Sequence, residues 1–136
     1  MMKKLIITLL LFLSAQATQA MELPDLKEMM KGLGKSAQNA QKAMLNEDEE
    51  LLYKSAKEIA DHREVKSNTK FKIATVLKLE MGDFKEWDEK VHKAASDLAK
   101  FANAGDKQAQ NKAYVKMIQG CFGCHLDFRY RLKGAN

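Results

Sequence analysis

The stretch Phe84–Phe101, FKEWDEKVHKAASDLAKF, has the clearest helical pattern in the chain. Its apolar residues recur in alternating steps of three and four: Phe84, Trp87, Val91, Ala94, Leu98 and Phe101. Residues at this spacing lie along one face of an α-helix, and so narrow a stripe is typical of the seam between packed helices. Asp83 is a suitable N-cap and Gly105 a suitable end, so the sequence predicts one helix between them.

The same spacing occurs on both sides of this stretch. Pro24 favours a helix start, and the inward positions that follow are Leu26, Met30, Leu33, Ala37, Ala40 and Met44. After a break at 46–50, where Asn46 and Glu49 resemble a capping box, a second helix is expected to reach about Val65. It would bury Leu52, Ser55 or Ala56, and Ile59, with His62 as a further candidate. Asp106 can cap a last helix, and Gly134 marks its end. The residues expected on the inward face of this helix are Ala113 or Tyr114, Met117, Cys121, His125, Phe128 and Leu132.

Residues 66–81 give a less uniform pattern. Residues 66–69 resemble a turn, and the apolar residues of 71–81 alternate like those of a strand but also fit a helix. We expect a long connection with some helix here. The prediction for the whole chain is therefore all-α, an antiparallel four-helix bundle, a fold whose facing helices commonly hold cofactors.

The N-terminus has the pattern of an export signal. Lys3 and Lys4 precede the apolar run Leu5–Leu13, which is too short for a permanent membrane span. We expect residues 1–20 to be a cleaved signal peptide, with cleavage after Ala20 preferred over Ala17, and residues 21–136 to be a single exported, periplasmic domain without a stable membrane anchor. Cleavage would remove two lysines and no acidic residue, so the charge of +5 would fall to +3. So small a charge, without a basic cluster, gives no support for nucleic-acid binding.

The chemistry-bearing segment is Cys121-Phe122-Gly123-Cys124-His125, which holds both cysteines. This spacing is the attachment signature of c-type haem, in which two thiols form thioethers and the next histidine ligates the iron. On a helix, Cys121 and His125 are one turn apart and Cys124 lies beside them. The alternatives are a thiol redox pair, half of a zinc site and a disulfide. A zinc site would need further ligands, and His62 and His92 lack the spacing of a ligand pair. A disulfide between these cysteines would close a very short loop and restrain little of the chain.

A bundle that carries this motif near the end of its last helix resembles the class II cytochromes c, the cytochrome c prime family. The resemblance is strongest over 82–131. It implies one haem c, attached near the C-terminal end of the last helix through Cys121 and Cys124, with His125 as the proximal iron ligand. Arg129 falls where the family often has a basic residue beside the haem, and the alternative for Arg129 is a solvated terminal arginine.

The sixth iron ligand separates two subtypes of this family. Some members leave the iron five-coordinate and bind small gases, whereas others use a first-helix methionine and carry electrons. The inward stripe favours Met30 over its neighbour Met29, although a methionine in a bundle is often only a core residue. We expect a non-enzymatic electron carrier with His125 and Met30 as iron ligands, which meets redox partner proteins through weak contacts. A gas-binding protein, a thiol oxidoreductase and a homodimer remain alternatives to test.

Overall fold

The computed structural model describes residues 23–133, and all the regular structure in this part of the chain is helical. The four long helices are α1 (Pro24–Asn46), α2 (Glu49–Ala60), α4 (Met81–Ala104) and α5 (Lys107–Cys124). The shorter elements are α3 (Ser67–Leu77), a 3₁₀ turn η1 (Lys78–Glu80), a π-helical turn η2 (His125–Arg129) and α6 (Tyr130–Leu132). The predicted all-α four-helix bundle is confirmed.

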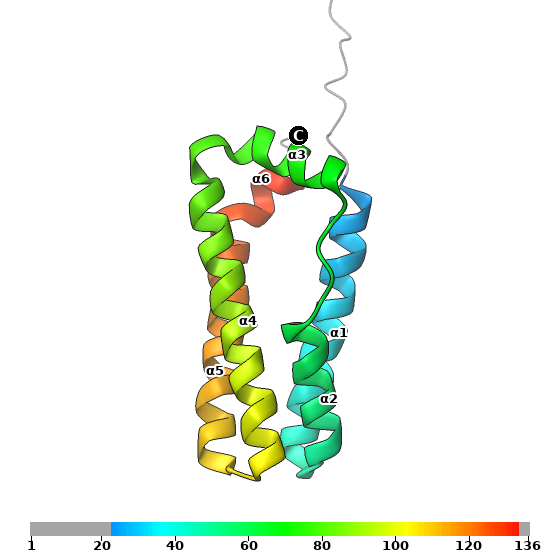
Figure 1. Ribbon diagram of the computed structural model, residues 1–136, viewed down its shortest axis with the longest axis vertical. Helices are drawn as coiled ribbons and strands as arrows, with labels where there is room; N and C mark the ends of the chain where they lie inside the picture. The colour runs from blue at the N-terminus through cyan, green and yellow to red at the C-terminus, as the bar shows by residue number, and fades with distance from the viewer. Residues whose placement is uncertain (1–22, 134–136) are drawn as a thin grey trace, which may run out of the picture.

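The long helices run antiparallel to their neighbours in the chain (Figure 1). The α1 helix packs against α2, α2 against α4, and α4 against α5, whereas α1 and α5 share no comparable backbone contact. The α3 helix lies across one end of the bundle, where it contacts α4 and α6. The bundle therefore has one loosely closed side, between α1 and α5, and one end covered by α3.

Small side chains let the helices approach closely in the half of the bundle far from α3. The buried cluster there combines alanines with a few large side chains: Ala40, Ala43, Leu52, Ala56, Ile59, Ala94, Ala95, Leu98, Ala99, Ala102, Ala113 and Met117. Leu52, Leu98 and Met117 are fully buried. The apolar area removed from water in this half stabilises the four-helix arrangement.

The half of the bundle near α3 is packed differently. Its buried residues are few: Leu23, Leu26, Ile73, Leu77 and Phe128. Around them lie half-buried apolar side chains, namely Met29, Met30, Val65, Val76, Met81, Phe84, Trp87, Cys124 and Leu132. Phe128 is buried, as its place in the inward stripe predicted, whereas Phe84 and Trp87 are half-buried beside it. The rings of Phe84 and Phe128 meet edge to face at 5.5 Å.

Some helix ends lie where the sequence predicted them, and others do not. Asp106 caps α5 by accepting a hydrogen bond from the Ala109 N–H at 3.0 Å, and Gly105 ends α4 in the left-handed conformation, φ 67°. Both predictions are confirmed. The predicted capping box at Asn46 is wrong, because Asn46 still belongs to α1 and Asp48 caps α2.

Asp83 is not the N-cap of α4 either, since this helix already begins at Met81 and Asp83 lies in its first turn. The negative side chain still lies at the positive end of the helix dipole there. The difference arises because η1 leads directly into α4, and the helical turns continue from Lys78 onward without a capping side chain.

The segment from the end of α2 to α4 also differs from the prediction. The α2 helix ends at Ala60 and not near Val65, residues 62–66 are extended, and the expected turn at 66–69 is the start of α3. Residues 71–81 form no strand. The α3 helix buries Thr69, Ile73 and Leu77, which are four residues apart, and exposes Phe71.

The predicted signal peptide, residues 1–20, and the predicted helix end at Gly134 lie outside the described residues. Among the helices of residues 23–133, none has the length and apolar character needed to cross a bilayer.

Candidate functional site

The Cys-x-x-Cys-His motif lies at the end of α5, close to where α3 covers the bundle. Cys121 and Cys124 occupy its last turn as free, half-buried thiols, and His125 begins the π-helical turn η2. The imidazole of His125 was predicted to point inward, but the structure places it among exposed residues. The three side chains are nevertheless within one turn of each other, as the attachment of one flat cofactor requires.

Two glycines fix how this motif faces the rest of the bundle. A Cβ atom on Gly123 would lie 2.3 Å from the ring of Trp87, and one on Gly120 would lie 2.8 Å from a methyl group of Val91. The Trp87 indole N–H also donates a hydrogen bond to the Asp127 carboxylate at 2.8 Å. The side of α5 that faces α4 is therefore occupied by glycine backbone. Since neighbouring helical residues differ in direction by about 100°, Cys121 and His125 point away from α4.

The environment of the thiols does not suit thiol redox chemistry. Burial raises the pKa of Cys121, and burial together with the nearby carboxylates of Asp88 and Asp127 raises the pKa of Cys124 to about 11. A reactive dithiol needs a lowered pKa and is typically found at a helix N-terminus, whereas this pair lies at the C-terminal end of α5. The geometry therefore disfavours a thiol oxidoreductase.

The protonation of His125 suits a metal ligand. Desolvation lowers the pKa of His125, and the positive charge of Arg129 lowers it further. Near neutral pH this favours the uncharged imidazole, the form that binds a metal ion. Arg129 itself is exposed and belongs to η2. The π-helical turn was not foreseen in the sequence, and such turns are frequently found at functional sites.

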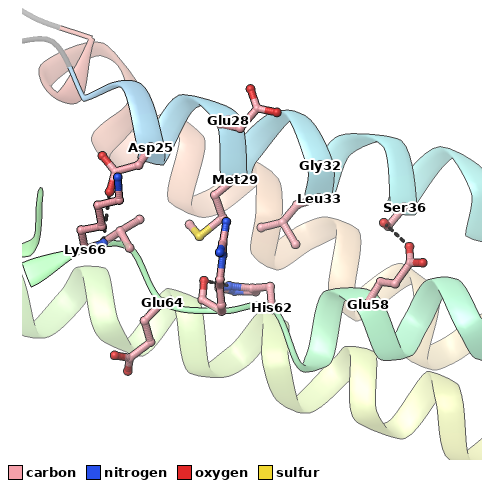
Figure 2. A pocket seen from close by; sticks show the side chains of 12 residues that line it. Asp25, Glu28, Met29, Gly32, Leu33, Ser36, Glu58, His62, Glu64 and Lys66 are labelled. Carbon is pink, nitrogen blue, oxygen red and sulfur yellow. Dashed lines mark hydrogen bonds between the residues drawn. The ribbon is translucent and has the colours of Figure 1, made fainter.

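Both candidate methionines lie at the motif end of the bundle, and they differ in the direction they take from α1. The face of α1 that contacts α2 carries Ser36, Ala40 and Ala43, all buried. Met29 shares this face and points towards residues 61–66, as Figure 2 shows. Met30 is about 100° further round the helix, on the side of Leu26. Both methionines pack against the apolar cluster that also includes Cys124, so it is their direction from α1 that separates them. Met30 is thus turned from α2 towards the loosely closed α1–α5 side.

A cavity of about 650 Å³ lies between α1 and the extended segment after α2 (Figure 2). Met29 and Leu33 supply part of its apolar lining, whereas Cys121, Cys124 and His125 do not reach it. At one end the Ser36 hydroxyl donates a hydrogen bond to the Glu58 carboxylate at 2.7 Å. Four carboxylates lie along the cavity: Asp25, Glu28, Glu58 and Glu64. The basic side chains of Arg63 and Lys66 line the cavity as well, so its charge alone does not decide what it could hold. The cavity is distinct from the motif because none of the three motif side chains lines it.

The residues around the motif are better suited to hold a covalently attached haem than the residues that line this cavity. Two thiols and an uncharged imidazole form the donor set of c-type haem attachment. Beside them, the half-buried side chains of Met30, Phe84 and Leu132 present apolar surface that a flat hydrophobic ring could cover. At this end of the bundle the methionine and aromatic side chains are partly exposed, whereas the other end has a tightly packed, alanine-rich core.

A second group of side chains, not foreseen from the sequence, comes together on the α2–α4 side of the bundle. His62, Asp88 and His92 place one nitrogen or oxygen atom each within 4.8 Å of one another. In the sequence, His62 was a candidate for burial in the second helix, and His62 and His92 lacked the spacing of a pair of zinc ligands. The four-residue spacing of Asp88 and His92 was a signal of their proximity, but nothing local to the sequence indicated that His62 would join them.

Comparison with known proteins supplies the family. A family model described as Cytochrome C' matches residues 15–129, which is most of the chain. Searches among curated proteins and solved structures gave no significant match. The matched segment includes the four long helices and the complete Cys-x-x-Cys-His motif. The chain therefore belongs to the cytochrome c prime family of haem c proteins.

Proposed function

We propose that this protein is an exported, periplasmic single-haem cytochrome that carries one electron at a time between redox partners. The observation that carries the proposal is the direction of Met30, which turns away from α2 at the end of the bundle that holds Cys124, whereas Met29 lines the cavity beside the segment after α2. A bound haem would supply reversible one-electron oxidation and reduction of its iron. The residues of the chain determine how the ring is held and which ligands the iron has.

Cys121 and Cys124 would hold the ring through thioether bonds, and His125 would offer its uncharged imidazole to the iron. Met30 would offer its thioether sulfur from α1 as the second protein ligand of the iron. Methionine and histidine together raise the potential of haem iron, as suits an electron carrier. Met29 is the rival ligand, but its direction towards residues 61–66 favours Met30.

The second candidate is a five-coordinate protein that binds small gases, which is the behaviour typical of the family. In that case Met30 would only pack over the open face of the iron, as methionines commonly do in bundle cores. The two functions require different spin states of the ferric iron, so spectroscopy of the haem-loaded protein separates them.

The deciding experiment is the absorption and EPR spectrum of the ferric protein and of two single variants. A low-spin signal with a weak sulfur-to-iron band near the red end supports electron transfer. The band should vanish in Met30→Ala and survive in Met29→Ala, which is the matched control from the next position of α1. A high-spin wild type would overturn the proposal in favour of gas binding, and a band lost only in Met29→Ala would reassign the ligand.

Electron exchange also needs a surface where a partner can approach the motif. Phe122, Leu126 and Tyr130 are exposed apolar residues that follow one another along the motif segment. We propose that redox partners dock here through a small and transient interface. Leu126→Ser should slow electron transfer to a partner at low protein concentration. The control Leu45→Ser changes an equally exposed leucine near the far end of α1, 78% exposed against 83% for Leu126. If Leu126→Ser instead only breaks a dimer, the surface joins two copies of this chain.

A further inference from the structure

The structure brings together two imidazoles and one carboxylate on the α2–α4 side of the bundle, and none of the three belongs to the Cys-x-x-Cys-His motif. His62 lies in the extended segment after α2, and Asp88 and His92 are one turn apart on α4. The imidazole rings of His62 and His92 are 4.4 Å apart between centroids. The carboxylate of Asp88 has one oxygen directed to each ring.

Backbone carbonyl groups fix the orientation of both rings. The Nδ1 atom of His92 lies 2.6 Å from the carbonyl oxygen of Ala60, at the C-terminus of α2. The Nδ1 atom of His62 lies 3.2 Å from the carbonyl oxygen of Arg63. A carbonyl oxygen can only accept, so each Nδ1 must carry the proton, and in the neutral imidazole the Nε2 lone pair is then free. Histidines that bind metal ions usually have their second nitrogen bonded in this way.

The distances between the free atoms suit a shared ion better than direct hydrogen bonds. Nε2 of His62 lies 3.7 Å from one Asp88 oxygen, and Nε2 of His92 lies 3.5 Å from the other. Hydrogen bonds from nitrogen to oxygen are about 2.7–3.2 Å long. Two ligands of one tetrahedral Zn²⁺, with bonds of about 2.0–2.2 Å, lie about 3.3–3.6 Å apart. The three side chains therefore surround a position that an ion of this size could occupy.

We propose that His62, Asp88 and His92 bind one divalent transition-metal ion of the Zn²⁺ or Cu²⁺ class and so join the segment after α2 to α4. Two imidazoles and a carboxylate form a donor set that these ions accept, and one further coordination position would remain for water. The site is open to entry from solvent, because the Asp88 side chain is 49% exposed and that of His92 is 30% exposed. The third histidine of the chain, His125, belongs to the haem motif, so these two are the imidazoles left for another ion.

The test uses the full haem-loaded protein after treatment with a chelator. Titration with Zn²⁺, followed by calorimetry and native mass spectrometry, should give one ion per chain, with a dissociation constant on the order of micromolar or tighter. Zn²⁺ should also raise the unfolding midpoint, because it binds the folded arrangement in preference to the unfolded chain. The absorption spectrum of the haem should keep the bands that report its iron ligands, since Zn²⁺ would use none of the motif residues.

Three variants each remove one ligand, so the test does not depend on any one of them folding. His62→Gln, His92→Gln and Asp88→Asn should each weaken Zn²⁺ binding at least about 10-fold and abolish the rise in midpoint. Asp83→Asn, which removes an exposed carboxylate from the same helix, should bind like the wild type. Absence of binding at about 100 times the expected constant, or binding that all three variants retain, would overturn the proposal and leave the cluster as an ion pair.

Discussion

Gly123 and Trp87 are in such close contact that a Cβ atom at position 123 would come within 2.3–2.7 Å of three carbon atoms of the indole ring. Such contacts cannot be accommodated without a shift of the ring or of the helix. We therefore expect Gly123→Ala to lower the free energy of unfolding by about 1–3 kcal/mol, the usual effect of overpacking. Denaturant titration of the haem-loaded protein measures this change.

A glycine elsewhere in the bundle provides the control. A Cβ atom on Gly34, within α1, would meet nothing within 4 Å. Gly34→Ala should stabilise the protein by up to about 1 kcal/mol, because alanine has the higher helix propensity. In addition, Gly123→Ala should cost less in a Trp87→Phe background, where the ring is smaller. Equal stabilities for Gly123→Ala and the wild type would mean that Trp87 moves aside freely.

The end of α1 and the start of α2 allow a second prediction. The Asp48 carboxylate accepts a hydrogen bond from the Leu51 N–H at 2.9 Å, and Asp106 does the same for Ala109 at the start of α5. Asp48→Ala and Asp106→Ala should each cost about 1 kcal/mol, as the loss of an N-cap usually does. Thermal unfolding followed by circular dichroism detects the difference.

Asn46→Ala distinguishes the two possible caps of α2. In the structure Asn46 is the last residue of α1 and is exposed, so its replacement should change stability by no more than about 0.5 kcal/mol. A loss as large as that of Asp48→Ala would restore the capping box that the sequence suggested.

The parts of the fold that the sequence predicted well are those decided by local pattern. The helix that begins with Pro24 and the one that ends at Gly105 follow from repeated apolar spacing and from residues with strong terminal preferences. The motif was equally predictable, because its three reactive residues are adjacent in the chain. The direction of Met30 followed from the same inward stripe that contains Leu26.

The parts that could not be predicted depend on contacts between distant segments. The α2 helix ends at Ala60 although no breaker stands there, and the carbonyl of Ala60 faces His92, 32 residues away. The alternating residues of 71–81 resemble a strand, yet only Ile73 and Leu77 of that stretch are buried, where α3 lies across the end of the bundle. Neither contact can be predicted from residues that are close together in the sequence.

A third prediction concerns acid sensitivity at the N-terminus of α1. The Asp25 carboxylate accepts a hydrogen bond from the Lys66 N–H, which Figure 2 shows, and another from the Thr69 hydroxyl. Both hydrogen bonds tie α1 to the start of α3. The Thr69 hydrogen bond is the main cause that holds the pKa of Asp25 below its ordinary value of 3.8. A carboxyl group with a lowered pKa stabilises the folded state above the pKa of the unfolded chain and loses this effect as pH falls through the folded value.

The unfolding midpoint of Asp25→Asn should therefore lie below that of the wild type at pH 6, and the two should converge as the pH falls below about 4. Thermal unfolding at a series of pH values gives both curves. Thr69→Val removes the hydroxyl donor and should reproduce most of the effect, and the double variant should lose less than the sum of the two. A midpoint difference that stays constant from pH 6 to pH 3 would show that Asp25 acts without its charge.

The last prediction compares two arginines that lie two residues apart in the chain, near the motif. Arg131 donates two hydrogen bonds of 2.7 Å to the Glu80 carboxylate, so its charge is compensated. Among the described residues Arg129 has no such carboxylate partner within ion-pair distance, and its charge acts on His125. A positive charge beside the haem favours the reduced iron, which carries one positive charge fewer than the oxidised form.

Arg129→Gln should consequently lower the reduction potential by tens of millivolts, since a nearby partly screened charge contributes on the order of 1 kcal/mol. Arg131→Gln should leave the potential nearly unchanged and instead release Glu80, which shows as a small loss of stability. Potentiometric titration of both variants decides the matter. If the two potentials shift equally, the effect comes from net charge alone, and Arg129 is then a solvated arginine with no particular place beside the haem.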